Sequence, residues 1–184
     1  VGVNLRTEDF GFTAQSYDPN MIVAAPQLSD WGETSARQTI ALVEWVLRAY
    51  SIDESRIFLE GYSGGGETLS LVMGIRPELF KRALFCSSQW DGNLDAVADA
   101  HVPVYLAIGE SDEYYGAGPA RRAAERLRQI YQSRGVDDRE IANLVTLDVK
   151  PASYFEADGV TNQHGGGGRL FSHDTQIMGW LFAQ

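Results

Sequence analysis

The 184-residue chain has little of several residue types, and each shortage excludes a class of protein. It contains one cysteine, Cys86, so it cannot form an internal disulfide. Its 15 lysines and arginines are outnumbered by 25 aspartates and glutamates, which gives a formal net charge of −10. Such a balance disfavours a nucleic-acid partner, because neutralising phosphates requires a clustered positive face. No apolar stretch reaches the ~20 residues of a transmembrane helix, so we expect no membrane partner.

Signals for metals and cofactors are equally scarce. The three histidines, His101, His164 and His173, lack the spacing of a metal site, and Cys86 lies in an apolar run that predicts a buried strand. The glycine clusters do not form the Gly-X-Gly-X-X-Gly pattern of a nucleotide-binding turn. We therefore expect neither a metal nor a cofactor. The first twenty residues show no targeting signal, so the compartment stays open, as does the oligomeric state.

The elements that the sequence does contain alternate between strands and helices. With 44% hydrophobic residues, the chain is long enough for one buried core and predicts a single domain over residues 1–184. Apolar runs predict five strands, at residues 21–25, 56–60, 82–86, 102–108 and 143–149. Helical patterns lie between them, at residues 34–50, 68–75, 119–134 and 172–182, with Thr34, Ser35 and Ser172 as candidate caps. This alternation predicts an α/β fold, with a mostly parallel sheet covered on both faces.

The most informative stretch is Gly61-Tyr62-Ser63-Gly64-Gly65, which follows an apolar strand and precedes a helical pattern. That context is typical of a nucleophile elbow. A serine hydroxyl becomes a good nucleophile when a sharp strand-to-helix turn exposes it beside a base and near backbone N–H groups. Small residues flank the serine because the turn is sterically tight. Ser63 is therefore the candidate nucleophile.

A serine nucleophile needs a base, and the base needs a carboxylate to orient it. Asp112 directly follows the predicted strand at 102–108, so it should emerge at the carboxyl end of the sheet, where open α/β folds place their sites. Asp91 follows the preceding strand and is the substitute acid, although Asp91-Gly92 is more typical of a turn.

Two histidines downstream of Asp112 can serve as the base. His164 lies in a predicted loop and is followed by four glycines, which we interpret as flexibility that lets the ring approach Ser63. His173 lies at the predicted start of the last helix, where a structural role is sufficient. The pattern favours His164 and leaves His173 as the alternative.

The order Ser63, Asp112, histidine, together with the elbow, resembles the α/β-hydrolase superfamily. Residues 23–27 followed by Trp31 are similar to a branch with esterases, polyhydroxybutyrate-depolymerase-like and feruloyl-esterase-like proteins and predicted peptidases. The resemblance implies Ser63 as nucleophile, Asp112 as acid, His164 or His173 as base, and the Gly64 N–H as an oxyanion donor. It implies a carboxylesterase that acts on a small-molecule ester through an acyl-enzyme. A peptidase of the same fold is the alternative, and a non-catalytic binding domain is the alternative from another class.

One part of the superfamily pattern has no counterpart at the start of this chain. The superfamily takes its second oxyanion donor from the loop after its third strand, and no such strand is predicted within residues 1–20. In that superfamily the third strand separates the strands that correspond here to residues 21–25 and 56–60. We therefore expect either a fragment that lacks the N-terminal strands, which we favour, or a reduced sheet in which these two strands pair directly.

Aromatic residues follow several of the predicted strands and can form a substrate pocket. Trp31, Trp90, Tyr114 and Tyr115 each come shortly after a strand, so we expect them to converge near Ser63 as an apolar wall suited to an acyl or aromatic ester. Tyr62, beside the nucleophile, is expected either to line this pocket or to pack inside the elbow.

Overall fold

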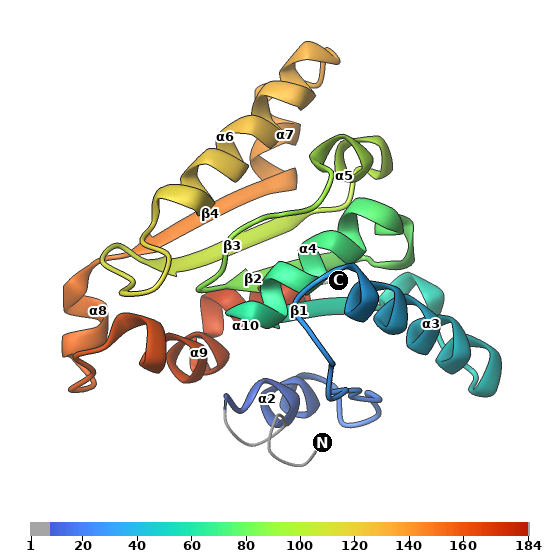
Figure 1. Cartoon of the computed structure of the whole chain (residues 1–184), viewed down its shortest axis with the longest axis horizontal. Helices are drawn as coiled ribbons and strands as arrows, with labels where there is room; N and C mark the ends of the chain where they lie inside the picture. Colours follow the sequence, from blue (N-terminus) through green and yellow to red (C-terminus); the bar gives the residue numbers. More distant parts are fainter. Residues whose placement is uncertain (1–7, 184) are drawn as a thin grey trace.

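The computed structural model describes residues 8–183 and is built on a four-stranded, wholly parallel sheet (Figure 1). The strands follow the chain in the order β1-β2-β3-β4. They span β1 (Phe58–Tyr62), β2 (Arg82–Cys86), β3 (Val104–Gly109) and β4 (Val145–Lys150). Because all four run in the same direction, their carboxyl ends meet at one edge of the sheet, where the candidate residues emerge.

Helices cover both faces of this sheet, and the strands bury alternate residues on each face. Leu59, Phe85 and Leu106 point into a core made with helices of one face. Those helices are α3 (Glu33–Ala49), α4 (Gly64–Ile75), α5 (Leu94–Ala100), α6 (Gly118–Ser133) and α7 (Asp138–Leu144). Leu84 and Tyr105 point the other way, into a second core. Its helices are α2 (Phe10–Tyr17), α8 (Ala152–Glu156), α9 (Gln163–His173) and α10 (Thr175–Leu181). This period of two is the signature of buried strands.

The predicted α/β class and parallel sheet are confirmed, but the number of strands is not. The strand predicted at 82–86 has the observed bounds, and those at 56–60, 102–108 and 143–149 are displaced by one or two residues at each end. Residues 21–25 form no strand, so the first predicted strand is wrong. They lack a ladder partner, because β1 is paired only with β2. Direct pairing of residues 21–25 with β1 is therefore also wrong.

The C-terminal helices differ from the prediction too. The glycines at 165–168 lie inside helix α9 rather than in a flexible loop, and the final helix begins at Thr175 with Asp174, not Ser172, as its cap. The helix packs closely at these positions: a Cβ on Gly166 would lie 2.3 Å from the Val160 side chain, and one on Gly168 would lie 2.2 Å from the carboxylate of Glu8. At the other end of the chain, α3 begins after Gly32 rather than at Thr34 or Ser35.

Two short 3-10 turns complete the description, η1 (Glu54–Arg56) before β1 and η2 (Pro77–Leu79) before β2. Pro77 occupies the first position of η2, where its missing N–H is not needed. Within residues 8–183, no helix combines the length and the apolar character that a membrane span requires.

Candidate active site

The turn between β1 and α4 holds Ser63 in a backbone conformation that few L-residues adopt. Ser63 has φ 54° and ψ −130°, a strained position of the kind that is retained at functional sites. The turn is sterically closed, because a Cβ on Gly61 would lie 2.8 Å from the Cα of Gly66. Its backbone is anchored from β2: the Ser63 N–H donates to the Cys86 carbonyl at 3.0 Å, and the Ser88 hydroxyl donates to the Ser63 carbonyl at 2.8 Å.

Ser63, His164 and Asp112 lie in one hydrogen-bonded line. The Ser63 Oγ is 3.0 Å from the His164 Nε2. The opposite ring nitrogen, Nδ1, lies 3.0 and 3.1 Å from the two carboxylate oxygens of Asp112. If Nδ1 carries its hydrogen toward the carboxylate, Nε2 has a free lone pair directed at the serine hydroxyl. The arrangement can therefore withdraw a proton from Ser63.

Asp112 is held rigidly at the end of β3. Its side chain is fully buried, and its Oδ1 accepts the backbone N–H groups of Tyr114 at 3.1 Å and Tyr115 at 2.9 Å. A buried carboxylate needs such partners, because an unpaired charge would be strongly destabilising. Both carboxylate oxygens can also accept a hydrogen bond from the His164 Nδ1.

The other candidate acid and bases lie elsewhere. His173 lies at the far end of α9, where its Nε2 is 3.0 Å from Asp9. His101 terminates α5 and packs against Tyr131. The carboxylate of Asp91 accepts only weak contacts, at 3.3 and 3.4 Å, from the Gln89 amide. The structure therefore brings His164 and Asp112 to Ser63. The prediction that His164 lies in a flexible loop was wrong, however, because His164 lies in the first turn of helix α9.

Three tyrosine rings surround the His164 imidazole. Their centroids lie 5.7 Å (Tyr62), 5.3 Å (Tyr114) and 5.5 Å (Tyr115) from it, and the first two are stacked on it. The Tyr62 hydroxyl also donates to the His164 carbonyl. Burial, reinforced by the charge of Glu8, raises the pKa of Tyr62, so this hydroxyl stays protonated as a donor. The rings confine the imidazole between them.

One polar residue near Ser63, Glu67, was not predicted from the sequence. Glu67 lies one turn after Ser63 in α4 and accepts a hydrogen bond from the Tyr115 hydroxyl at 2.7 Å. Burial and this hydrogen bond raise the pKa of Tyr115, while an interaction with the Ser63 hydroxyl opposes the rise. The spacing Ser63 to Glu67, four residues on a helix, was the available signal.

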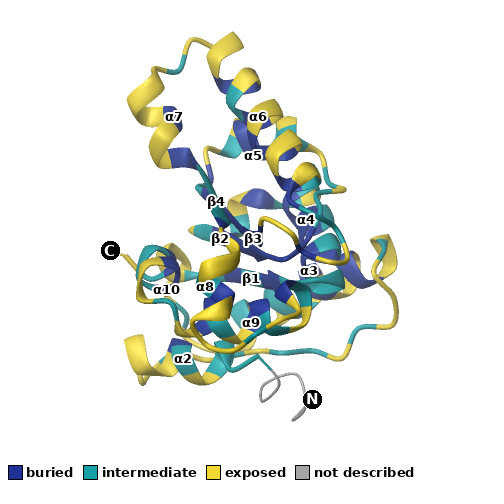
Figure 2. Cartoon of the chain, turned by 90° about the vertical axis from the view of Figure 1, so that its left-hand side faces the viewer, coloured by how far each residue is buried: buried dark blue, intermediate teal, exposed yellow. Residues whose placement is uncertain are grey.

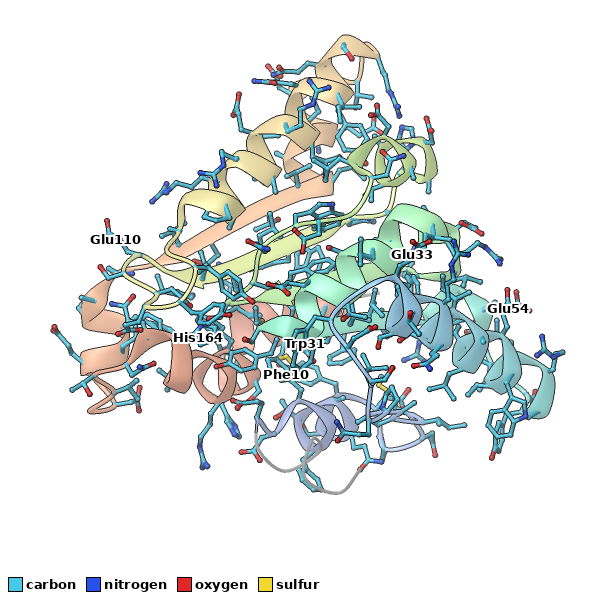
Figure 3. The ribbon with its side chains drawn as sticks, viewed as in Figure 1. Phe10, Trp31, Glu33, Glu54, Glu110 and His164 are labelled. Carbon is cyan, nitrogen blue, oxygen red and sulfur yellow. The ribbon has the colours of Figure 1, made fainter. Side chains whose placement is uncertain are left out.

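A cavity of about 980 Å³ opens beside Ser63 and continues along the free edge of β1. Trp31, Tyr62, Tyr114 and Tyr115 border it. Figure 3 labels Trp31, which borders the cavity, and His164, whose ring contacts Ser63. The indole of Trp31 covers Gly64: a Cβ at Gly64 would lie 2.8 Å from its Cδ2.

Trp90 does not line this cavity, so the prediction that it forms part of the pocket wall near Ser63 is wrong. Its ring packs against Phe85 at 4.7 Å between centroids, and its Nε1–H donates to the Gly92 carbonyl at 2.9 Å. Phe85 points toward the core under α4 and α5, so Trp90 is drawn to that core and away from the serine. Across residues 8–183, no group of three or more potential ligands is arranged to hold a metal ion.

Comparisons with known proteins agree with the fold of the chain. The sequence model of the prolyl oligopeptidase family matches residues 28–132, which include Ser63 and Asp112. A thermostable esterase crystal structure has a TM-score of 0.69 at 23% identity, over 87% of this chain and 42% of that one. A putative dienelactone hydrolase from Klebsiella pneumoniae has a TM-score of 0.50 at 19% identity, over 82% and 60%. These likenesses concern the fold, and the chain spans less than two thirds of either protein. No curated protein sequence matches the chain significantly.

Proposed function

The chain belongs to the prolyl oligopeptidase family within the α/β-hydrolase superfamily, and on that premise we propose that it hydrolyses carboxylic esters through an acyl-enzyme on Ser63. The observation that carries this proposal is the line from Ser63 Oγ to His164 Nε2 and from His164 Nδ1 to Asp112, each step near 3.0 Å. A serine on a strained elbow, with an oriented imidazole in contact, is the arrangement that activates a hydroxyl.

In the first step His164 accepts the Ser63 proton at Nε2 while Oγ attacks the ester carbonyl carbon. The imidazole becomes a cation, which the buried Asp112 carboxylate stabilises across the 3.0 Å contact to Nδ1. The Nδ1 contact also keeps the ring in the tautomer that presents a lone pair to the serine. Collapse of the tetrahedral intermediate releases the alcohol, which takes its proton from His164.

The negative oxygen of the tetrahedral intermediate needs donors that are already in place. Gly64 is the first residue of α4, and the first N–H groups of a helix have no acceptor within that helix. Its N–H is therefore the proposed oxyanion donor. Trp31 packs on this residue and shields that side of the turn from water. Water then attacks the acyl-enzyme, with His164 again as the base, and frees the acid and Ser63.

Peptide hydrolysis is the second candidate function, and the name of the matched family favours it. The same three residues would act on an amide. An amide has a poorer leaving group than an ester, so it depends more strongly on oxyanion stabilisation, and one lost donor slows turnover by about 10²- to 10³-fold. With Gly64 as the one donor assigned, esters are the substrates that this site should turn over fastest.

The experiment that tests the proposal is labelling of the intact protein with a fluorophosphonate, followed by mass measurement. We expect one adduct, absent in Ser63→Ala and His164→Ala and retained in His173→Ala, whose histidine lies at the other end of α9. Turnover of p-nitrophenyl acetate should exceed that of a peptide p-nitroanilide. No adduct on the unmodified protein would support the non-catalytic binding domain instead, and faster amide turnover would support the peptidase.

A further inference from the structure

The helix that carries His164 is intrinsically weak at the end where the histidine lies. Four consecutive glycines follow His164 in α9, and each disfavours a helix by about 1 kcal/mol relative to alanine. Close packing demands them, as at Gly166 against Val160. The first N–H groups of a helix also lack acceptors within it. Something outside the helix must therefore hold this turn in place.

The loop after β3 supplies that support through Glu113. The Gln163 N–H donates to the Glu113 Oε1 at 3.1 Å, and the His164 N–H donates to the Oε2 at 2.9 Å. Hydrogen bonds to an ionised carboxylate are stronger than neutral ones, and a negative charge at a helix N-terminus is favourable. These hydrogen bonds, above all that from His164, lower the pKa of Glu113, so the carboxylate is ionised at neutral pH.

Two further contacts connect the loop after β3 to the first turn of α9. The Gln163 side-chain oxygen accepts the Ser111 N–H at 2.9 Å, and the His164 ring contacts Asp112 at 3.0 Å. Three consecutive residues, 111, 112 and 113, thus each contact residue 163 or 164. Glu113 binds the backbone of the residue whose ring Asp112 orients, so it controls where that ring lies relative to Ser63.

We propose that Glu113 is a positioning residue for His164, which anchors the first turn of α9 to the loop that carries Asp112. The inference rests on the proposed function, because positioning matters for catalysis only if His164 is the base. The Glu113 carboxylate accepts the His164 N–H at 2.9 Å, so it acts on the position of the residue that carries the ring. The other titratable groups that face His164 are Asp112, Glu8, Tyr62, Tyr114 and Tyr115.

The test compares Glu113→Ala and Glu113→Gln with Glu110→Gln, a control acid on the same loop whose exposed side chain projects from the rim of the molecule (Figure 3). For p-nitrophenyl acetate hydrolysis, we expect Glu113→Ala to lower kcat roughly 10- to 100-fold with KM little changed, because a small misplacement of a catalytic group has that effect. Glu113→Gln keeps one acceptor oxygen but loses the charge. Its kcat should therefore fall less than that of Glu113→Ala, because one of the two hydrogen bonds to α9 can still form.

Hydrogen exchange of the amides in residues 163–168 provides a readout that does not depend on activity. Protection there should fall in Glu113→Ala and stay unchanged in Glu110→Gln. Unchanged protection, or wild-type kcat in both Glu113 variants, would overturn the inference. If the wild-type protein hydrolyses no ester while protection is still lost in Glu113→Ala, the proposed function fails and the anchoring contact stands.

Discussion

Strands β1 and β3 each deliver a residue of the candidate site, but they lie in different surroundings. Every residue of β3 from Val104 to Ile108 is buried, and the strand is paired on both sides. β1 is paired on one side only, and Phe58, Glu60 and Tyr62 are half-buried beside the large cavity (Figure 2). Asp112 therefore follows a fully enclosed central strand, and Ser63 follows a strand at the edge of the sheet.

The difference shows how the two halves of the site are kept in place. The half with Asp112 and His164 is specified several times over, by buried strands and by contacts from Ser111, Asp112 and Glu113 to α9. The half with Ser63 depends on local sterics, namely the close approach of Gly61 to Gly66 and two hydrogen bonds from the end of β2. A nucleophile that must meet substrate benefits from an open side, whereas the acid and base need rigidity.

The largest expected effect is on kcat, when the charge of Asp112 is removed from the enclosed half of the site. Asp112→Asn keeps the shape of the side chain, but it loses the charge that stabilises the imidazolium and favours the wrong ring tautomer. We expect kcat for p-nitrophenyl acetate to fall by roughly 10⁴-fold. Asp91→Asn, at the end of β2, should stay within twofold of the wild type. Equal losses in the two variants, measured at the same folded fraction by circular dichroism, would contradict the assignment of Asp112.

Replacing one leucine on each side should reveal the same contrast in the free energy of unfolding. Leu84 in β2 is fully buried, so Leu84→Ala should lower the free energy of unfolding by about 2–5 kcal/mol. Leu42 in α3 is half-buried at the cavity, and Leu42→Ala should lower it by less than about 1.5 kcal/mol. Urea unfolding followed by tryptophan fluorescence measures both. A larger loss at Leu42 would mean that the β1 side is enclosed in solution.

The smallest expected effect concerns Glu60 in β1, whose pKa burial raises to about 8, with a contribution from the charge of Glu8. Its Oε1 is buried and, among the described residues, has no hydrogen-bond partner. Because the folded state holds the proton more tightly, the contribution of Glu60 to stability is complete below pH ~4.5 and is lost as pH rises through about 8. The residue as a whole is half-buried, so we expect an effect of about 1 kcal/mol.

Thermal unfolding at pH 5 and pH 9 measures this loss. Glu60→Gln should unfold about 2–4 °C above the wild type at pH 9 and close to it at pH 5. Glu54→Gln, at an exposed position just before β1, is the matched control and should follow the wild type at both values. The same difference between Glu60→Gln and wild type at both pH values would show that Glu60 does not titrate in this range.

Part of the architecture could be predicted because it depends on neighbours in the chain. Apolar runs with short helical segments between them identified four of the strands, and the run at 82–86 even had the observed bounds. The glycines around Ser63 identified the elbow, because only small residues tolerate the contact between Gly61 and Gly66. Residues 21–25 satisfied the same local rule, yet a strand also needs a partner, and no strand within residues 8–183 pairs with them.

By itself, the sequence determined the candidate nucleophile, the alternation of strands and helices and the order of the candidate residues, since steric and periodic preferences act over a few positions. The tertiary structure decided which histidine meets Ser63, since that contact joins residues 101 positions apart. It also decided that the glycines at 165–168 are helical, because packing against Val160 and Glu8 and the anchor at Glu113 outweigh their weak helix propensity. It likewise drew Trp90 into the core, because ring packing depends on the face of the sheet that a distant side chain occupies.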